Sequence, residues 1–225
     1  MSGKLIVLEG LDGSGKATQT TLLCNMLRTH GCPVRHLEFP DYSHPSSALV
    51  RMYLEGEFGS QPQDVNAYGA SSFYAVDRYA SYLKFWKQEY EAGGVMVADR
   101  YTTSNAIYQM VKLERGEWNN YLQWLQDYEY ERLRLPKPDA VIYLDMPTEI
   151  SQRLMSKRYQ GDETKKDLHE SNVAFLAQCR EAALYSAQAL GWRVVPCAQG
   201  QEPRRIEAIH EDVFAIIREV FDFIC

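Results

Sequence analysis

Short runs rich in apolar residues recur along the chain, and each is bounded by glycine, proline or charged residues. Runs of this kind are typical of strands that are buried on both faces of a parallel sheet. We expect strands at residues 5–8, 34–39, 95–98, 140–144 and 192–196.

Between these runs, apolar residues recur every three or four positions, which is the spacing of one face of a helix. We expect helices at residues 16–30, 48–55, 64–92, 102–112, 118–132, 148–158, 168–190 and 203–223. Strands that alternate with helices predict an α/β fold, here a five-stranded, mostly parallel sheet flanked by helices in three layers. No long linker or repeat interrupts the pattern, so we expect a single domain over residues 1–225.

Composition narrows the range of partners. The chain has 225 residues, and its 24 Lys and Arg against 30 Asp and Glu give a net charge of −6, which argues against a nucleic-acid polymer. The apolar run after the first residues is too short for a signal peptide or a membrane span, so we expect a cytoplasmic protein without a membrane partner. The five cysteines contain no C-x-x-C pair, and we expect reduced thiols rather than a zinc or redox site.

The most specific motif is a glycine-rich loop between the first predicted strand and the first predicted helix. It reads Gly10, Leu11, Asp12, Gly13, Ser14, Gly15, Lys16, Ala17 and Thr18. Backbone N–H groups of such a loop, together with the start of the helix, form a nest for phosphate oxygens. Lys16 would reach the β- and γ-phosphates, so we expect an ATP site here.

The loop departs from the usual pattern at one position, because Ala17 stands where a serine or threonine would ligate Mg²⁺. Thr18 is rotated by about 100° around the helix and should not take over this contact directly. Either the loop is inactive, or Mg²⁺ is held by waters, phosphates and a carboxylate, with no direct protein ligand in the loop. Gly-Lys-Ala-Thr-Gln is similar to the Gly-Lys-Gly-Thr-Gln stretch of adenylate kinases, which favours the second interpretation.

Three further clusters are expected beyond the carboxyl ends of the strands, where α/β sheets bind their ligands. Their aromatic and polar members are Phe39, Phe73, Tyr74, Arg78, Asp99, Arg100, Tyr101, Ser104, Tyr108 and Gln109. Tyr74 and Arg78 are four residues apart on the longest predicted helix, so the ring and the guanidinium share a face. Such a pair can stack on a base and hydrogen-bond its edge.

Together these motifs resemble those of the thymidylate kinases, in the nucleoside monophosphate kinase group of the P-loop kinases. The resemblance covers nearly the whole chain and keeps the order of the motifs, from the phosphate loop through Phe39-Pro40 and Tyr74-x-x-x-Arg78 to Asp99-Arg100-Tyr101 and residues 135–139. It implies a P-loop kinase fold with a mobile lid. It also implies transfer of the γ-phosphate of MgATP to dTMP, which gives dTDP for dTTP synthesis.

The resemblance assigns roles around the acceptor phosphate and the sugar. Arg100 would grip the acceptor phosphate, and Asp99 would help to hold Mg²⁺ through water. Asp12 would contact the sugar 3′-hydroxyl, and Tyr101 would back the sugar. ATP and dTMP are then the small-molecule substrates, with Mg²⁺ as the cofactor of ATP.

The resemblance also assigns the base site. Tyr74 would lie against thymine with Phe73 or Phe39 nearby, and Arg78 would bond the base carbonyl. The residues that complete the pocket would be Ser104, Tyr108 and Gln109. One position departs from the family pattern, because Tyr42 stands where many members have an arginine after Phe-Pro, and Arg51 or another side chain would have to substitute.

A charged segment at about residues 153–167 is interpreted as the lid. The phosphate loop contains no arginine, and phosphoryl transfer needs positive charge on the transferring group. Family members without an arginine in the loop supply it from the lid, so we expect Arg153 and Arg158 to be the lid cations, with Lys157 as the alternative. The family precedent is a homodimer built on helices. The aromatic helix 118–130 is a candidate surface for it, with packing in the core as the alternative interpretation.

Three alternatives remain open. A deoxynucleoside kinase would accept a 5′-hydroxyl and would need a carboxylate base, for which Glu9, Glu38 or Asp41 are candidates. Another (deoxy)nucleoside monophosphate kinase, specific for dUMP or dGMP, would differ at only a few base contacts. A nucleotide-binding protein that has lost catalysis is the third, and Ala17 and Tyr42 are its only support.

Overall fold

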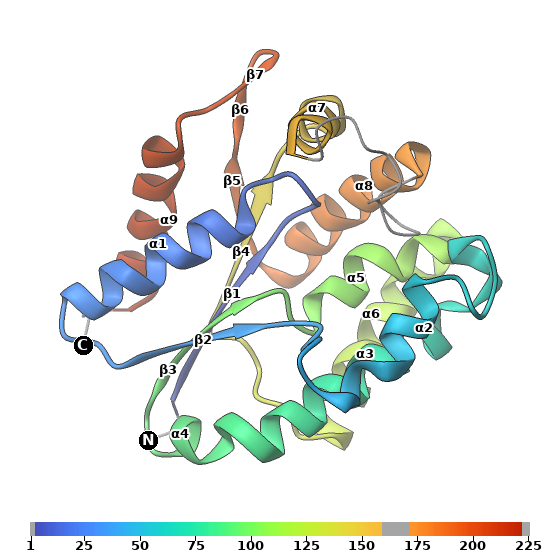
Figure 1. Ribbon diagram of the computed structural model, residues 1–225, viewed down its shortest axis with the longest axis horizontal. Helices are drawn as coiled ribbons and strands as arrows, with labels where there is room; N and C mark the ends of the chain where they lie inside the picture. The colour runs from blue at the N-terminus through green and yellow to red at the C-terminus, as the bar shows by residue number, and fades with distance from the viewer. Residues whose placement is uncertain (1–2, 159–171, 222–225) are drawn as a thin grey trace.

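The computed structural model describes residues 3–158 and 172–221, and a five-stranded sheet forms its centre (Figure 1). The strands are β1 (Lys4–Glu9), β2 (Val34–Glu38), β3 (Val95–Asp99), β4 (Ala140–Asp145) and β5 (Arg193–Pro196). Their order across the sheet is β2-β3-β1-β4-β5, and every pairing in this sheet is parallel. The predicted α/β class and the five predicted strands are confirmed.

The register of the sheet gathers acidic residues at one edge. Leu8 of β1 pairs with Asp99 of β3, and Glu38 of β2 pairs with the same Asp99. Glu9 follows at the end of β1 and stands opposite Tyr143 of β4. Three carboxylates therefore lie at the carboxyl ends of adjacent strands, where α/β sheets place their ligand sites.

Helices cover both faces of the sheet (Figure 1). They are α1 (Lys16–Thr29), α2 (Ala48–Leu54), α3 (Ala67–Ser81), α4 (Lys87–Glu91), α5 (Thr103–Tyr108), α6 (Trp118–Gln126), α7 (Thr148–Arg158), α8 (Val173–Leu190) and α9 (Ile206–Val220). On one face, α1 and α9 share a buried cluster with Leu8 and Ile142 of the sheet. On the other face, α5, α6 and α8 pack around Tyr143, which completes the predicted three layers.

The elements differ from the prediction mainly in how the long helices are wound. The predicted helix 64–92 is α3 and α4 joined by a π-helical segment, Tyr82–Trp86, and a second π-helical segment, Asp127–Arg132, follows α6. A π-helical turn takes in an extra residue, and apolar spacing over a short window does not reveal it. Also unpredicted are the hairpin of β6 (Ala198–Gln199) and β7 (Glu202–Pro203) and the 3₁₀ turns Pro45–Ser47, Pro62–Asp64, Met110–Lys112 and Arg115–Glu117.

Most large aromatic side chains serve the core. Trp118 and Tyr121 of α6 are buried against α8 and α5, and the dimer surface expected on this aromatic helix stays a prediction. A different set of large apolar side chains is exposed, and it follows one face of α3 and the π-helical segment after it. This set, called the α3 stripe below, consists of Tyr68, Val76, Tyr79 and Leu83.

The cysteines agree only in part with the expected reduced thiols. Cys24, Cys179 and Cys197 are buried and free. Cys32 is disulfide-bonded, so the expectation is wrong at this position. None of the described helices combines the length and the apolar character that a membrane span requires. The cytoplasmic location stays a prediction.

Candidate active site

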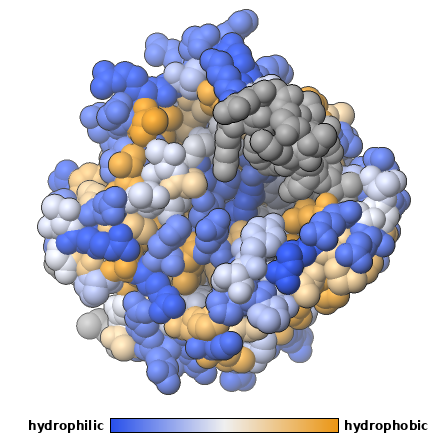
Figure 2. All heavy atoms as spheres, in the orientation of Figure 1, coloured by the Kyte–Doolittle hydropathy of each residue, from blue (hydrophilic) through white to orange (hydrophobic). Residues whose placement is uncertain are grey.

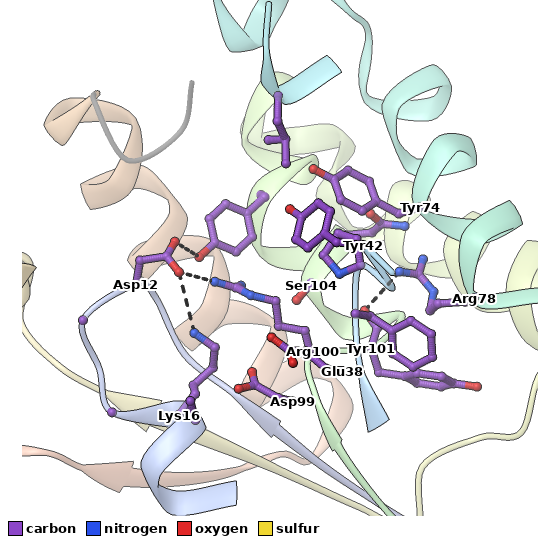
Figure 3. A pocket seen from close by; sticks show the side chains of 18 of the residues that line it. Asp12, Lys16, Glu38, Tyr42, Tyr74, Arg78, Asp99, Arg100, Tyr101 and Ser104 are labelled. Atoms are coloured by element: carbon purple, nitrogen blue, oxygen red, sulfur yellow. Dashed lines mark hydrogen bonds and ion pairs between the residues drawn. The ribbon is translucent and has the colours of Figure 1, made fainter. Parts of the chain in front are cut away.

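A cavity of about 510 Å³ lies at the carboxyl ends of β1, β2 and β3. In the space-filling view, hydrophilic side chains line a recess near the middle of this face (Figure 2). Figure 3 shows Asp12 and Lys16 at one end of the cavity and Tyr74 and Arg78 at the other, with Arg100 between them. The phosphate loop and the acceptor clusters, which are far apart in the sequence, thus meet in one pocket.

The phosphate loop needs glycine for steric reasons. Gly13 (φ 80°) and Gly15 (φ 90°) have left-handed backbone conformations, which favour glycine. A Cβ on Gly13 would lie 2.7 Å from the carbonyl oxygen of Ser151, and a backbone atom cannot easily move away. Gly15 is the N-cap of α1, so the loop brings the positive end of this helix to the cavity wall.

Lys16 is held at this end with little solvent contact, since only 8% of its side chain is exposed. Its Nζ donates to the carbonyl oxygen of Leu11 at 3.4 Å and lies 3.9 Å from Oδ1 of Asp12. Burial and the nearby Arg100 lower the pKa of Lys16, while surrounding carboxylates, Asp12 first among them, oppose this shift. An ammonium group has three N–H donors, so Lys16 keeps donors for phosphate oxygens.

Asp12, Arg100 and Tyr108 form a contact set in the middle of the cavity (Figure 3). Arg100 Nη2 lies 2.5 Å from Oδ1 of Asp12, and the Tyr108 hydroxyl donates to Oδ2 at 3.2 Å. Burial alone would raise the pKa of Asp12, but the charges of Arg100 and Lys16 outweigh it and lower this pKa to about 2. Asp12 is therefore an anion at neutral pH, and it can accept a hydrogen bond from a sugar hydroxyl.

Hydrogen bonds to the carboxylate of Glu9 fix the turn after β3. Arg100 has a left-handed backbone (φ 67°), which is uncommon outside glycine. The buried carboxylate of Glu9 accepts from the Tyr101 N–H (3.2 Å), the Thr103 hydroxyl (2.6 Å) and the Ser104 hydroxyl (2.9 Å). Burial raises the pKa of Glu9, and the nearby Arg100 opposes this. Glu9 thus stabilises the conformation that aims Arg100 into the cavity.

The far end of the cavity contains a second arginine. Arg78 lines the cavity, but only 2% of its side chain is exposed. Its Nε and Nη2 donate to the two oxygens of Glu129 at 2.8 and 2.5 Å, and Nη1 donates to the Tyr101 carbonyl at 3.4 Å. Asn105 Nδ2 donates to the same Glu129 carboxylate at 3.0 Å. The predicted base-binding arginine is therefore at the cavity and already held by a buried carboxylate.

Several other predicted residues reach the cavity. The structure places these lining residues around it: Phe39, Tyr74, Asp99, Tyr101, Ser104, Tyr108, Gln109, Ala17 and Thr18. Asp99 lies beside Lys16 in Figure 3, and its side chain is 8% exposed. Gln109 Oε1 is buried and has no hydrogen-bond partner among the described residues. Tyr101 is fully buried, and its hydroxyl donates to the Pro136 carbonyl at 3.1 Å.

Other predicted residues lie elsewhere. Phe73 packs against Phe58 at 5.5 Å between ring centroids and is not among the lining residues. Gly10, Leu11 and Ser14 belong to the loop but are buried behind the cavity wall. Arg51 donates to the Tyr42 carbonyl at 3.1 Å, so it braces the loop in which Tyr42 lines the cavity.

The predicted lid lies mostly outside the described residues. Arg153 is described, and its Nη2 donates to the Gln201 carbonyl in the β6–β7 turn at 2.6 Å. It also forms an ion pair with Glu202 at 3.3 Å, so it joins α7 to the hairpin. Arg158 is the last residue of α7. Residues 159–167 of the lid prediction fall outside the described residues.

Sequence reasoning missed two residues of this site and underestimated a third. Glu129 and Asn105, which hold Arg78, were not expected at all, and Glu9 was considered only as a base for the alternative nucleoside reaction. A signal was present for Glu129. In the pattern of α6, buried Trp118, Leu122 and Leu125 predict an apolar residue near 129, and a glutamate there must find a partner.

The fold and the cavity together define a class of protein. A parallel sheet, a glycine-rich loop with its lysine at the start of a helix, and a second subsite with cations and aromatic rings are the parts of a P-loop phosphotransferase. The structure is similar to that of the thymidylate kinase of Candida albicans, with a TM-score of 0.70 and 23% sequence identity over 97% of this chain and 92% of that one.

Sequence comparisons narrow this class to one family. A family model described as thymidylate kinase matches residues 8–213. The Mycobacterium tuberculosis thymidylate kinase is 31% identical over 209 residues, which cover 91% of this chain and 95% of that protein. The human thymidylate kinase is 28% identical over 217 residues, covering 94% and 88%. The chain belongs to the thymidylate kinase family.

Proposed function

We propose that this chain transfers the γ-phosphate of MgATP to dTMP and releases dTDP and ADP, which supplies dTTP synthesis. One observation carries the proposal: the phosphate loop and the Arg100–Arg78 subsite open into the same cavity. Family membership supports the identity of both substrates. The cavity volume of about 510 Å³ is within the usual range for small-molecule sites.

At the donor end, the loop and the start of α1 bind the triphosphate of ATP. Lys16 supplies a buried positive charge beside the β- and γ-phosphates, where low exposure makes the charge more effective. Phosphoryl transfer asks the protein mainly to position its reactants and to neutralise charge. A phosphate monoester oxygen is already ionised near neutral pH, so the acceptor phosphate needs no general base.

The residues at the cavity also fit a hydrated Mg²⁺. The carboxylate of Asp99 is at the cavity wall beside Lys16, and Mg²⁺ is commonly held by one or two carboxylates together with waters and phosphates. Bound Mg²⁺ would neutralise charge on the β- and γ-phosphates.

At the acceptor end, Arg100 takes the phosphate of dTMP, and Asp12 accepts the sugar 3′-hydroxyl. Arg100 Nη2 lies 2.5 Å from Oδ1 of Asp12 in this structure. We therefore expect Arg100 to share its N–H donors between this carboxylate and the phosphate of dTMP when it binds. Tyr108 lies under the Arg100 guanidinium, 5.0 Å from it to the ring centroid. This contact limits the movement of the guanidinium toward one side.

The thymine base would occupy the end with Tyr74 and Arg78. Arg78 would donate to the base carbonyl, and Tyr74 would lie against the ring. Gln109 adds a buried acceptor without a partner among the described residues, and an N–H of the base is a donor that could satisfy it. Ser104 also lines the cavity and would complete this pocket.

We also propose a lid over residues 153–167 with Arg153 and Arg158 as its cations. Arg158 ends α7, whose Leu154 and Met155 line the cavity, and this supports a lid that begins beside the donor site. Arg158→Ala should lower kcat far more than it raises the KM for dTMP, measured by steady-state kinetics. An unchanged kcat would exclude Arg158 as the lid cation.

A homodimer is the proposed assembly, with the α3 stripe as its surface. Each side chain of the stripe is more than a third exposed. The spacings along the chain are eight, three and four residues, which keeps Tyr68, Val76, Tyr79 and Leu83 on one face of the helix. An apolar face of this kind is typical of an interface between helices.

Phosphate transfer from radiolabelled ATP to separate acceptors tests the function. The proposal predicts label on dTMP and not on thymidine, with dUMP and dGMP as further acceptors in the panel. Glu38 lines the cavity and could serve a nucleoside kinase as base, so label on thymidine alone would favour that alternative. ATP binding without transfer to any acceptor would favour a protein that has lost catalysis.

A further inference from the structure

Arg78 and Glu129 form a fully buried ion pair at the base end of the cavity. Arg78 is 2% exposed and Glu129 is 0% exposed, and two parallel hydrogen bonds of 2.8 and 2.5 Å join them. On the basis of the proposed function, we propose that Glu129 is a positioning residue that fixes the guanidinium of Arg78 and thereby sets the preference for a base with a carbonyl acceptor.

The hydrogen-bond count of Arg78 leaves donors for a ligand. A guanidinium carries five N–H groups and no acceptor. Nε and one N–H of Nη2 go to Glu129, and one N–H of Nη1 goes to the Tyr101 carbonyl. Two N–H groups remain on a side chain that lines the cavity. Since the guanidinium is planar, the two bonds to Glu129 also fix the direction of these remaining donors.

Glu129 is itself held from several sides. Asn105 Nδ2 donates to Oε1 of Glu129 at 3.0 Å and to the Ser71 carbonyl at 3.3 Å. The Tyr121 hydroxyl lies 2.6 Å from Ser71 Oγ and donates to the Asn105 carbonyl at 3.3 Å. The network joins α3, α5, α6 and the π-helical segment after α6, so neither carboxylate oxygen can rotate freely.

Stability alone is a weak reason for such a pair. The cost of removing two charges from water can exceed their attraction, and well-packed apolar residues often replace a buried ion pair without loss of stability. The pair lies at the wall of the cavity, beside the ring of Tyr74 (Figure 3), where a fixed direction of donors is useful. Burial would lower the pKa of Arg78, but the charge of Glu129 outweighs it and raises this pKa, so the guanidinium stays protonated.

The chemistry of a guanidinium defines the ligand. Its donors require an acceptor on the base edge, such as the 4-carbonyl of thymine or uracil. The exocyclic amine of cytosine would bring a donor against these donors and leave them without partners, which is strongly unfavourable in a buried site. If the guanidinium loses its fixed direction, it can turn away from the amine, so the penalty against cytosine becomes smaller.

Glu129→Gln tests this role, with Glu131→Gln as the matched control. Glu131 lies two residues away, is 62% exposed and pairs with Lys137 on the surface. For folded Glu129→Gln, we expect the KM for dTMP to rise about tenfold and the ratio of kcat/KM for dTMP over dCMP to fall about tenfold or more. The KM for ATP should stay unchanged, and kcat should change by less than about threefold. Glu131→Gln should match the wild type in every parameter.

A conservative change separates positioning from structure. Glu129→Asp keeps the charge but draws the carboxylate back by about one C–C bond, ~1.5 Å, so the ratio for dTMP over dCMP should lie between those of Glu129→Gln and the wild type. If Glu129→Gln does not fold, the double variant Arg78→Met/Glu129→Leu, which leaves no unpaired charge, should show the same loss of preference as Arg78→Met alone.

The outcomes also separate this inference from the proposed function. A wild type that transfers phosphate to dTMP, together with a folded Glu129→Gln that keeps the full preference over dCMP, would overturn the role of Glu129. A wild type that leaves dTMP unphosphorylated would overturn the proposed function itself. Binding of dTMP and dCMP by calorimetry would then still measure whether Glu129 sets the base preference of the cavity.

Discussion

Arg100 and Arg78 both line the cavity, yet the two side chains are held in opposite ways. Arg100 has a left-handed backbone after β3, is 18% exposed and pairs with a carboxylate that is 25% exposed. Arg78 lies in the regular helix α3, and both it and Glu129 are buried. A partly exposed pair can exchange partners when a phosphate arrives, whereas a buried bidentate pair keeps its geometry.

The difference separates two tasks within one pocket. The phosphate end must accept a charged group and release it, so its ionic contacts have to be replaceable. The base end has to recognise one pattern of donors and acceptors, which requires a fixed direction more than a large attraction. A completely buried glutamate supports each end of the cavity. Glu9 orients residues at the phosphate end, and Glu129 orients Arg78 at the base end.

Arg100→Ala should cause the largest loss of activity. Removing a charge-assisted contact to the reacting phosphate should lower kcat/KM for dTMP by about 10³-fold. Arg35→Ala is the control, because Arg35 pairs with Glu89 at the surface and is 38% exposed. Steady-state kinetics on both variants measure this. If Arg100→Ala lowers kcat/KM for dTMP by less than tenfold, Arg100 does not bind the reacting phosphate, and the proposed difference in role between Arg100 and Arg78 is contradicted.

Asp12 tests the phosphate end through pH. Its pKa is about 2 in the folded chain against an ordinary 3.8, so the ionised carboxylate stabilises the fold above pH 4. This contribution, about 2 kcal/mol, is lost as the pH falls from about 4 toward 2. The difference in unfolding free energy between the wild type and Asp12→Asn, measured in urea, should be constant from about pH 5 to 7 and shrink toward pH 3. A difference that does not depend on pH would contradict ionic coupling of Asp12 to Arg100.

Ala17→Ser should have a smaller effect on activity. Ala17 is exposed at the cavity wall, so a hydroxyl fits there without disturbing the core. If Mg²⁺ is held through water and phosphates, as proposed, activity should stay within about tenfold, equivalent to roughly 1.4 kcal/mol of barrier. Kinetics with MgATP check this. A gain of several orders of magnitude would show that the loop depends on the missing hydroxyl.

Val76→Glu places a charge on the exposed face of α3, the helix that carries Arg78. Since this face lies outside the cavity, kcat should stay within about twofold of the wild type. Val76 is 42% exposed on the α3 stripe, and a charge there should prevent an apolar interface. The mass measured by light scattering should fall from that of a dimer to about 26 kDa, close to the 25.9 kDa of one chain. An unchanged dimeric mass would place the interface on another face.

Much of the fold could be predicted from the sequence because the signals are local. All five strands lie within one residue of their predicted ends, and α7 matches its predicted range at 148–158. The phosphate loop is readable because its geometry requires glycine and lysine at fixed spacing, as Gly13 and Gly15 show. The β6–β7 hairpin has strands of only two residues, which are too short to give an alternating pattern.

The sequence predicts those site residues that are expected to contact a ligand directly, because their residue types stand in recognisable local motifs. Lys16, Arg100 and Arg78 are at the cavity, as the motifs predict. Residues that act through another side chain were missed, because a contact such as Arg78–Glu129 spans 51 positions in the sequence. A local sequence pattern cannot indicate a partner that is so far away in the sequence. The lid cations stay a prediction, since most of the segment lies outside the described residues.

The most direct test is a competition in which dTMP, dUMP, dCMP and dGMP are present together at equal concentration with limiting MgATP. The initial ratios of the diphosphate products give the ratios of kcat/KM for the four acceptors in one measurement. We predict dTDP as the main product, dUDP as the next, and dCDP at least about 10³-fold below dTDP, because Arg78 offers only donors to the base. Equal formation of dCDP and dTDP, or formation of no diphosphate, would contradict a fixed thymine-recognising end in this cavity.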